Sequence, residues 1–137
     1  MIFSFAIEGS PVAKGRPRLT VRGGHARAYT PAKTRSYESM VAERAREAFG
    51  DAPPFAGPVE IEAHFSIGIA KSWKASVRRA ALDGTKHPGK PDIDNYLKAL
   101  ADGLNGIVYA DDSQIVSARV TKRYAVDPGV VVTVRSL

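Results

Sequence analysis

The sequence predicts a single α+β domain with four to five strands and two to three helices. A chain of 137 residues has the usual size of one domain. Apolar residues alternate strictly from Val59 to Ile69, which is typical of a long strand with one buried face. Apolar residues from Ile93 to Ile107 recur at spacings of four, three, four and three, which is typical of an amphipathic helix.

The other elements of the first half follow from local patterns. The apolar run Ile2 to Ile7 predicts a strand. The glycines and prolines of residues 12–29 predict a basic loop, or a loose hairpin with its tip at Gly23-Gly24. Thr30 is the expected N-cap of a helix that has Pro31 at its first position and ends at Gly50. The expected apolar face of this helix consists of Tyr37, Met40, Val41, Ala45, Ala48 and Phe49.

The second half predicts two more helices and two more strands. Ser72 is the expected N-cap of a short helix, with Trp73 and Val77 facing inward. The helix with the regular apolar stripe ends at Asn105-Gly106, and a turn follows at Asp111-Asp112. Residues 115–124 and 130–134 predict two strands joined by a tight turn at residues 127–129.

Composition excludes several classes of protein. The chain contains no cysteine, which excludes disulfide bonds, thiolate metal sites and cysteine nucleophiles. No apolar run approaches the roughly 18 residues of a membrane span. The first residues lack the basic start and the cleavage site of a signal peptide. We therefore expect a mature cytoplasmic protein that contacts no membrane.

Positive charge is concentrated in one segment. Between Glu8 and Glu38 there are seven Lys and Arg residues and no acidic residue. Since the whole chain has a net charge of +6 and this segment carries +7, the remaining residues have a net charge of −1. A concentrated cationic segment favours a polyanionic partner such as nucleic acid. The alternative interpretation is a solvated loop that only aids solubility.

Two aspartates stand at the start of the predicted helix. Pro91 interrupts any preceding helix and Asp is a preferred N-cap, so the chain is expected to be extended through Asp92. In extended backbone, residues i and i+2 project to one side, which would bring the carboxylates of Asp92 and Asp94 together. Lys98 lies one turn after Asp94 on the same helix face.

The turn at Asp111-Asp112 adds further carboxylates. If the following strand returns beside the helix, one of them can reach Asp92 and Asp94. Carboxylates about 4 Å apart repel by about 4 kcal/mol at an effective dielectric near 20, so such clusters usually hold a cation. Oxygen ligands favour Mg²⁺ or Mn²⁺ over Zn²⁺, and carboxylate-bound Mg²⁺ near a lysine is typical of phosphoryl transfer. The ordinary alternative is a helix cap, a helix-dipole residue and a plain turn.

At these residues the sequence resembles the RusA family of Holliday-junction resolvases, which are small endodeoxyribonucleases. The resemblance rests on Lys90-Pro91-Asp92-Ile93-Asp94-Asn95, on Lys98 with residues 99–106, and on Asp111-Asp112-Ser113-Gln114-Ile115-Val116. The upstream motifs Lys14-Gly15-Arg16-Pro17-Arg18, Tyr29-Thr30-Pro31 and Ser72-Trp73 are similar to phage-type members. With these motifs, a looser resemblance extends over nearly the whole chain.

The resemblance implies a role for each matched residue. Asp92 and Asp94 match two aspartates that bind a divalent metal ion, and Asp112 matches the catalytic aspartate of the turn. Asp112 is therefore the third expected metal ligand, and Lys98 matches an essential catalytic lysine. The weaker supporting candidates are Asp111, Asn95 and the nearby loop residue His87.

The resemblance also implies the activity and the assembly. It implies a small mixed β-sheet, an intertwined homodimer, and Mg²⁺ as cofactor with Mn²⁺ as a substitute. The expected reaction places paired symmetric nicks in a four-way DNA junction, with no small-molecule cofactor. Residues 92–124 would form the catalytic helix, turn and strand, and residues 12–29 the DNA-contacting loop. The DNA-binding candidates are Lys14, Arg16, Arg18, Arg22, Arg27 and Lys90.

Three other functions remain open at this point. The first is a nuclease that prefers flaps, forks or single strands, because all branched DNA presents similar phosphates. The second is a non-catalytic module that binds nucleic acid, which would leave the aspartates unexplained. The third is another magnesium enzyme such as a nucleotidyl transferase, although the sequence contains no glycine-rich phosphate-binding loop.

Overall fold

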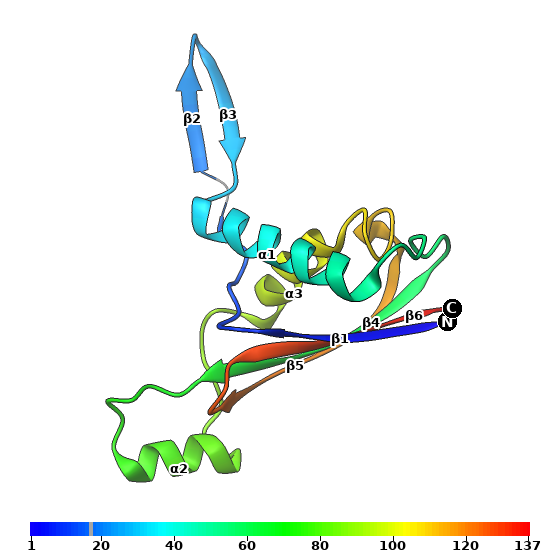
Figure 1. Cartoon of the computed structure of the whole chain (residues 1–137). Coiled ribbons are helices and arrows are strands. Elements are labelled where there is room, and N and C mark those ends of the chain that lie inside the picture. Colours follow the sequence, from blue (N-terminus) through cyan, green and yellow to red (C-terminus); the bar gives the residue numbers. More distant parts are fainter. Residues whose placement is uncertain (17) are drawn as a thin grey trace.

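Figure 1 shows the computed structural model of the chain, which describes residues 1–16 and 18–137. A four-stranded sheet has the order β1 (Ile2–Glu8), β6 (Gly129–Ser136), β4 (Val59–Gly68) and β5 (Ile115–Ala125). A separate hairpin consists of β2 (Arg18–Arg22) and β3 (His25–Tyr29). The described residues also form three α-helices, α1 (Ala32–Phe49), α2 (Ala75–Asp83) and α3 (Ile93–Leu104). The predicted α+β fold of a single small domain is confirmed.

The four-stranded sheet is mixed, as predicted. β4 pairs with β5 in parallel and with β6 antiparallel, and β1 pairs antiparallel with the other edge of β6. The tight turn predicted at residues 127–129 joins β5 to β6, but β4 lies between these two strands. The turn therefore crosses the end of β4, where a Cβ at Gly68 would lie 3.8 Å from Pro128.

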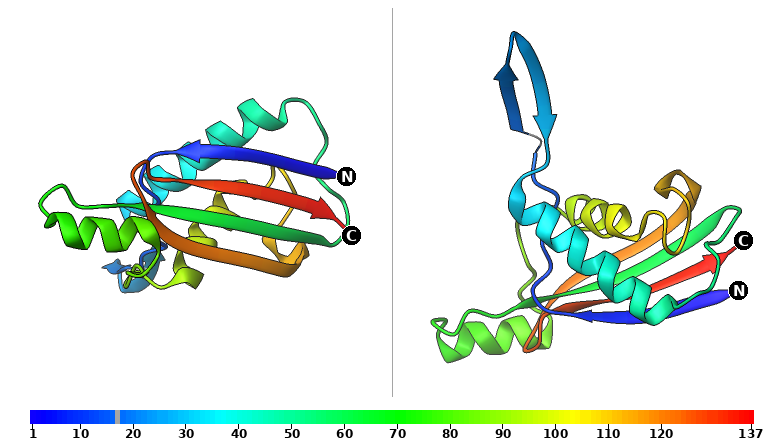
Figure 2. Two further views of the ribbon diagram at one scale, coloured as in Figure 1. Left: turned by 90° about the horizontal axis from the view of Figure 1, so that it is seen from below. Right: turned by 45° about the horizontal axis from the view of Figure 1, so that its top comes forward.

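One face of the sheet forms the core. The alternation predicted for the long strand is confirmed, because Val59, Ile61, Ala63 and Phe65 of β4 are buried. Their cross-strand neighbours Val130, Val132 and Val134 of β6 are buried on the same face. Helices α1 and α3 both cover this face, and Figure 2 shows them behind the sheet when it is seen from below. Within the described part of the chain, no helix lies over the centre of the opposite face (Figure 2).

Each covering helix buries one stripe. Leu100 and Leu104 of the predicted α3 stripe are fully buried, whereas Ile93, Leu97 and Ile107 are half-buried around them. In α1, Tyr37, Val41 and Ala45 are buried, and Met40 and Phe49 lie at the edge of the core. Ala48 was expected on this apolar face but is exposed, and the following residue, Phe49, makes the contact with the core instead, through Phe3 and Phe55.

The basic loop expected at residues 12–29 contains the hairpin, with its tip at Gly23-Gly24 as predicted. Both glycines have positive φ, 57° and 80°, which suits a two-residue hairpin turn. The hairpin stands away from the sheet and its helices (Figure 1). Pro17 and the side chains of Arg18 and Arg22 lie outside the described part of the chain.

Two predicted helix starts were wrong by one or two residues. Pro31, not Thr30, is the N-cap of α1, because its ψ of 146° keeps the backbone extended until Ala32. Lys74, not Ser72, is the N-cap of α2, because Ser72 belongs to a turn in which the Trp73 N–H donates to the Ala70 carbonyl oxygen. Within the described residues, no helix is long and apolar enough to cross a membrane.

Candidate active site

The start of α3 has the backbone that the sequence predicts. Asp92 is the N-cap, with φ −67° and ψ 148°, so the chain is extended through this residue. Lys122 of β5 holds the preceding loop, since its Nζ donates to the carbonyl oxygens of Gly89 at 2.6 Å and Pro91 at 2.9 Å. The carboxylate of Asp92 accepts no capping hydrogen bond. The plain-cap interpretation therefore does not account for this side chain.

Asp94 and Lys98 follow on α3. Asp94 is exposed in the first turn, where the positive end of the helix dipole favours an acidic residue. The ammonium of Lys98 lies between two other carboxylates, 2.9 Å from Asp102 Oδ1 and 2.9 Å from Asp112 Oδ2. The hydrogen bonds to Asp112 and Asp102 raise the pKa of Lys98 well above its usual range. Lys98 is therefore a fixed cation at this site.

The turn that carries Asp112 is held by its neighbours. The Asp111 carboxylate accepts a hydrogen bond from the Ser113 N–H at 3.0 Å, and Gln114 Oε1 accepts one from the Asp111 N–H at 3.1 Å. Gln114 Nε2 in turn donates to the carbonyl oxygens of Phe55 at 2.7 Å and Gly57 at 2.9 Å. These bonds form a capping box at the short 3₁₀ helix Asp112–Gln114. They give Asp111 a structural role and fix the direction in which Asp112 leaves the chain.

A second layer of charges lies behind Lys98. Asp102 Oδ2 is 3.0 Å from the ammonium of Lys14, which also lies 2.6 Å from Glu38 Oε1. Burial acts to raise the pKa of Asp102, but the hydrogen bonds from Lys98 and Lys14 outweigh it and lower that pKa. Lys14 was expected to contact DNA. Its ammonium instead has two carboxylate partners within the protein, and its contact with DNA stays a prediction.

The aspartates expected to bind metal are brought to one region but not into one cluster. Asp112 reaches α3 through Lys98, because β5 returns beside the helix as predicted. Among residues 1–16 and 18–137, no three Asp, Glu or His side chains are gathered closely enough to hold a metal ion. The metal-ligand roles of Asp92, Asp94 and Asp112 therefore stay predictions.

The remaining candidates lie around this region. His87 and Lys90 are exposed in the loop before α3, and Asn95 is half-buried in its first turn. Arg16 and Arg27 are exposed at the base of the hairpin and on β3. All four cationic or ionisable side chains are thus accessible to a ligand.

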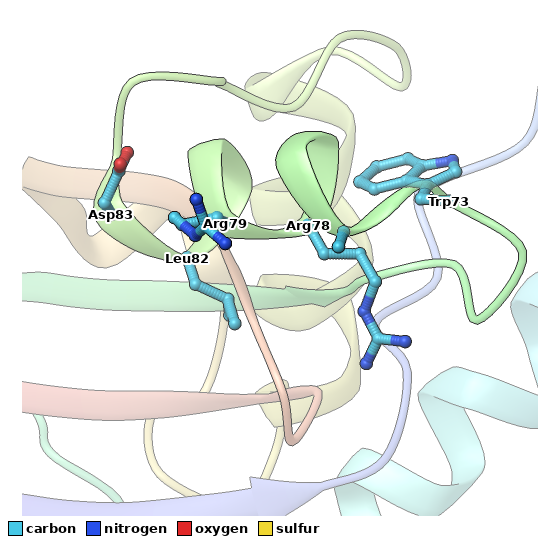
Figure 3. Close-up of a pocket in the computed structure, with 6 residues that line it drawn as sticks. Trp73, Arg78, Arg79, Leu82 and Asp83 are labelled. Carbon is cyan, nitrogen blue, oxygen red and sulfur yellow. The ribbon is translucent and has the colours of Figure 1, made fainter.

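A second basic surface lies on α2. Figure 3 shows Trp73, Arg78 and Arg79 around a shallow hollow on this helix, together with Leu82 and Asp83. Trp73 is half-buried, as predicted, because its ring meets Tyr124 edge-on at 5.2 Å between centroids. Lys86 Nζ lies 5.4 Å from the centroid of the Trp73 ring, a cation–π distance. The aromatic pair attaches the α2 segment to β5.

Sequence reasoning missed three residues of this site. Asp102 follows Lys98 by four residues, so the same helix-face rule that links Asp94 to Lys98 could have found it. Gln114 follows Asp111 by three residues, so the capping-box pattern could have indicated its bond to the Asp111 N–H, but not its bond to Phe55, 59 residues away. Glu38 carries no comparable signal, because its partner lies 24 residues away in the chain. Only the packing of α1 on α3 reveals Glu38, and only the packing of the turn on residues 55–57 reveals the longer-range bonds of Gln114.

Comparison with known proteins shows the family of this chain. Residues 8–135 match the family described as endodeoxyribonuclease RusA. An uncharacterized protein of Bacillus subtilis (strain 168), YqaN, is 34% identical over 139 residues, which cover 97% of this chain and 95% of the relative. The match spans the N-terminal basic segment as well as the helix, turn and strand that carry the aspartates and Lys98. This chain therefore belongs to the RusA family of endodeoxyribonucleases.

Proposed function

We propose that this protein is a Mg²⁺-dependent endonuclease that resolves four-way DNA junctions by paired nicks. The RusA family acts on branched Holliday-junction DNA and consists of metal-dependent nucleases. The observation that carries the proposal is the ammonium of Lys98, held 2.9 Å from Asp112. Asp94 is exposed one helical turn before Lys98, and the Asp92 carboxylate makes no capping hydrogen bond. The absence of cysteine fits a reducing, cytoplasmic location.

The donor chemistry fits a hard divalent cation. Asp92, Asp94 and Asp112 offer only carboxylate oxygens, which suit Mg²⁺ and, as a substitute, Mn²⁺. These three residues would hold the ion, with Asp111 engaged in its cap. When bound there, Mg²⁺ would activate a water and neutralise negative charge on the phosphate.

The side chains of the site have distinct tasks in this proposal. Lys98 presents a compact positive charge that contacts the scissile phosphate, stabilises charge in the transition state or orients the water. Its two hydrogen bonds to carboxylates keep it protonated and therefore a donor. Gln114 and the capping box hold Asp112 in place, and Lys122 holds the loop that leads to Asp92.

The positive surfaces would position the DNA. Arg16 and Arg27 at the hairpin, with Arg18 and Arg22 from the same segment and Lys90 beside Asp92, would contact phosphates on either side of the cleaved bond. The exposed Arg78 and Arg79 of α2 would contact a neighbouring arm. Phosphate contacts fix orientation without reading sequence, as a structure-specific nuclease requires.

A cleavage panel tests this proposal. Four-way, three-way, flap and linear DNAs of matched length would be incubated with the protein and Mg²⁺, with Asp112→Asn as the control for contaminating nuclease. We expect the four-way junction to be cut fastest and in symmetric pairs. If linear DNA is cut as fast as the four-way junction, the protein is a less selective nuclease and the proposal is wrong. If the protein binds DNA but cleaves none in Mg²⁺ or Mn²⁺, it is a non-catalytic binding module.

A further inference from the structure

Five side chains of alternating charge form one line through the protein. In order they are Glu38, Lys14, Asp102, Lys98 and Asp112, joined by contacts of 2.6, 3.0, 2.9 and 2.9 Å. They come from the segment before the hairpin, from α1, from α3 and from the turn before β5. The line therefore connects the root of the basic hairpin to the proposed catalytic lysine.

The exposed side chain of Lys98 must be held by neighbouring groups if its ammonium is to keep one position. Its side chain is 53% exposed, and ordering a lysine costs up to about 2 kcal/mol of rotamer freedom. Asp102 is only 18% exposed and both of its carboxylate oxygens are engaged, Oδ1 by Lys98 and Oδ2 by Lys14. Asp112, the other partner of Lys98, is the residue proposed to bind Mg²⁺. Asp102 is thus the anchor that the ion does not compete for.

Lys14 is itself held by backbone contacts. Its N–H donates to the Asn95 carbonyl oxygen at 2.8 Å, and the Gly15 N–H donates to Thr34 Oγ1 at 3.0 Å. A Cβ at Gly15 would lie 2.9 Å from Pro31 Cγ, so the segment passes close against the start of α1. The fold therefore fixes the backbone at Lys14, and the two salt bridges hold its ammonium.

We infer that Asp102 and Lys14 are positioning residues that hold the ammonium of Lys98 at the catalytic carboxylates. This inference rests on the proposed function. If Lys14 is replaced, Asp102 Oδ2 loses its ion pair, and the carboxylate is then free to rotate away from Lys98. A displacement of about 1 Å at a catalytic group can reduce turnover on the order of 100-fold. The effect should appear in kcat, because the charged groups of Lys14 and Asp102 are paired with other side chains of the protein.

The test compares Asp102→Asn, Lys14→Met and Lys14→Arg with Arg44→Met, which breaks an exposed ion pair of α1 with Glu47. We expect kcat for junction cleavage to fall about 10- to 100-fold in the first two variants, to recover largely in Lys14→Arg, and to be unchanged in Arg44→Met. Junction affinity, measured in Ca²⁺ without turnover, should stay within about twofold. ¹⁵N NMR of lysine ammonium groups, without metal, should show the Lys98 signal weakened by Asp102→Asn and by Lys14→Met.

Each result has one meaning. If the wild type cleaves the junction and Lys14→Met keeps its kcat and the Lys98 signal, the positioning role is wrong while the proposed function stands. If Lys14→Met loses affinity and not kcat, Lys14 contacts DNA instead. If the wild type cleaves no DNA, the proposed function itself fails. Should Asp102→Asn be too unstable to measure, Lys14→Met and Glu38→Gln carry the same comparison.

The β2–β3 hairpin has one apolar face and one polar face. Strand alternation and the β2–β3 register place the side chains of Leu19, Val21, Ala26 and Ala28 on one face, and those of Thr20, His25, Arg27 and Tyr29 on the other. Leu19 and Val21 are 74% and 72% exposed. Two-stranded hairpins are marginally stable alone, and β2 and β3 pair only with each other among the described strands. The apolar face of the hairpin therefore calls for a partner.

The positive charge of the hairpin segment favours DNA over a second copy of the chain as this partner. The hairpin lies in the segment with seven positive charges and no acidic residue, whereas the remaining residues of the chain have a net charge of −1. A second copy of the chain offers little to neutralise the segment, and DNA offers one phosphate per strand at every step. Two-stranded β-ribbons fit DNA grooves, and apolar side chains can insert between bases that separate easily.

We propose that Leu19 and Val21 pack against unstacked bases at the branch point of the DNA, with Arg27 on the phosphates. This also rests on the proposed function. A junction with 2-aminopurine at the branch point should brighten severalfold when the wild type binds it in Ca²⁺. The double variant Leu19→Ser/Val21→Ser should lose most of the increase, and Val126→Ser, another exposed apolar residue at 66%, should retain it. Both variants should bind linear duplex DNA with an affinity within about twofold of that of the wild type.

Two outcomes would overturn this second proposal. An undiminished fluorescence increase in the double variant would show that the apolar face does not reach the bases. A change of oligomeric state in sedimentation, with lost brightening, would show that the face packs on a second copy of the chain. If the wild type itself does not bind the junction, the proposed function fails first.

Discussion

Gly103 of α3 packs directly against Val41 of α1. A Cβ at Gly103 would come within 2.7 Å of Val41 Cγ1 and within 3.1 Å of the Glu38 carbonyl oxygen. Val41 is fully buried, so it has no room to move aside. This contact brings the Glu38 turn of α1 next to Asp102, the residue that precedes Gly103.

The close contact predicts the effect of Gly103→Ala. In an exposed helix the change would stabilise by about 1 kcal/mol, but here the added methyl group overpacks a buried contact, which typically costs about 1–3 kcal/mol. We expect a net loss of about 1–2 kcal/mol in the free energy of unfolding, measured in urea. Gly57→Ala, which has open space at its Cβ position, should change it by less than about 0.5 kcal/mol. An unfolding free energy at or above that of wild type would contradict the tight contact.

Asp92→Asn should abolish cleavage and leave the fold intact. Asn is as good an N-cap as Asp, and the Asp92 side chain makes no capping bond to lose. Junction binding should survive or strengthen, because a negative charge facing phosphate is removed. Cleavage assays and binding in Ca²⁺ measure both effects, and Asp127→Asn, an exposed aspartate of the β5–β6 turn, is the control. Near-normal turnover in both Asp92→Asn and Asp112→Asn would make the metal-ligand assignment wrong.

Removing the exposed guanidinium groups of Arg16 and Arg27 should weaken binding to all DNA structures alike. Each lost phosphate contact lowers the slope of log affinity against log salt by about 0.9 for duplex DNA. The double variant Arg16→Gln/Arg27→Gln should therefore show a slope smaller by about 1.8 in titrations at several salt concentrations. Arg44→Gln, on α1, is the control for a change of one exposed charge. If the slope of log affinity against log salt is unchanged, the basic segment between Glu8 and Glu38 only aids solubility.

Much of the fold follows from the sequence because it depends on local periodicity. The alternation of Val59 to Phe65 and the stripe of Leu100 and Leu104 are set by which face is buried, and the structure buries them. The order of the strands is different. The sequence around Gly68 and Pro128 does not indicate that the β5–β6 turn crosses β4, because strand order depends on contacts between distant segments.

The site likewise contains features that local sequence patterns predict and features that only long-range packing determines. The extended backbone at Asp92 and the reach of Asp112 to α3 were predictable, since a proline, a cap residue and a returning strand carry local signals. The partners of Lys14 were not. A basic motif in a charged segment predicts an exposed contact with DNA, and only the tight packing of α1 on α3 creates a half-buried acidic site for it.

The stability of the protein should depend on pH through Asp102. Its pKa is lowered in the folded protein by Lys98 and Lys14, so ionised Asp102 stabilises the fold above the unfolded pKa of about 3.9. That contribution is lost as the pH falls through the lower folded pKa. The difference in unfolding free energy between wild type and Asp102→Asn should thus be largest near pH 7 and shrink below about pH 4. Urea unfolding from pH 7 to pH 2.5 measures it, and a constant difference would contradict the ion pairs.

The protein should be a homodimer with two active sites. Resolving a four-way junction requires two symmetric nicks, and one chain carries one set of Asp92, Asp94, Asp112 and Lys98. A two-fold dimer supplies the second set. The sheet face opposite α1 and α3 leaves Ile2 and Val131 67% and 49% exposed, which is apolar surface available for such an interface. Light scattering at micromolar concentration should give about twice the mass of the 14.7 kDa chain.

Mixed dimers separate this assembly from two independent monomers. Wild-type and Asp94→Asn chains, unfolded together and refolded, should give heterodimers with one competent site. We expect these heterodimers to nick one strand of a supercoiled cruciform plasmid and to leave the junction unresolved, because the second nick has no site to make it. Wild-type homodimers should linearise the same plasmid by paired nicks within one binding event. A monomer by light scattering that still linearises the cruciform would contradict the dimer.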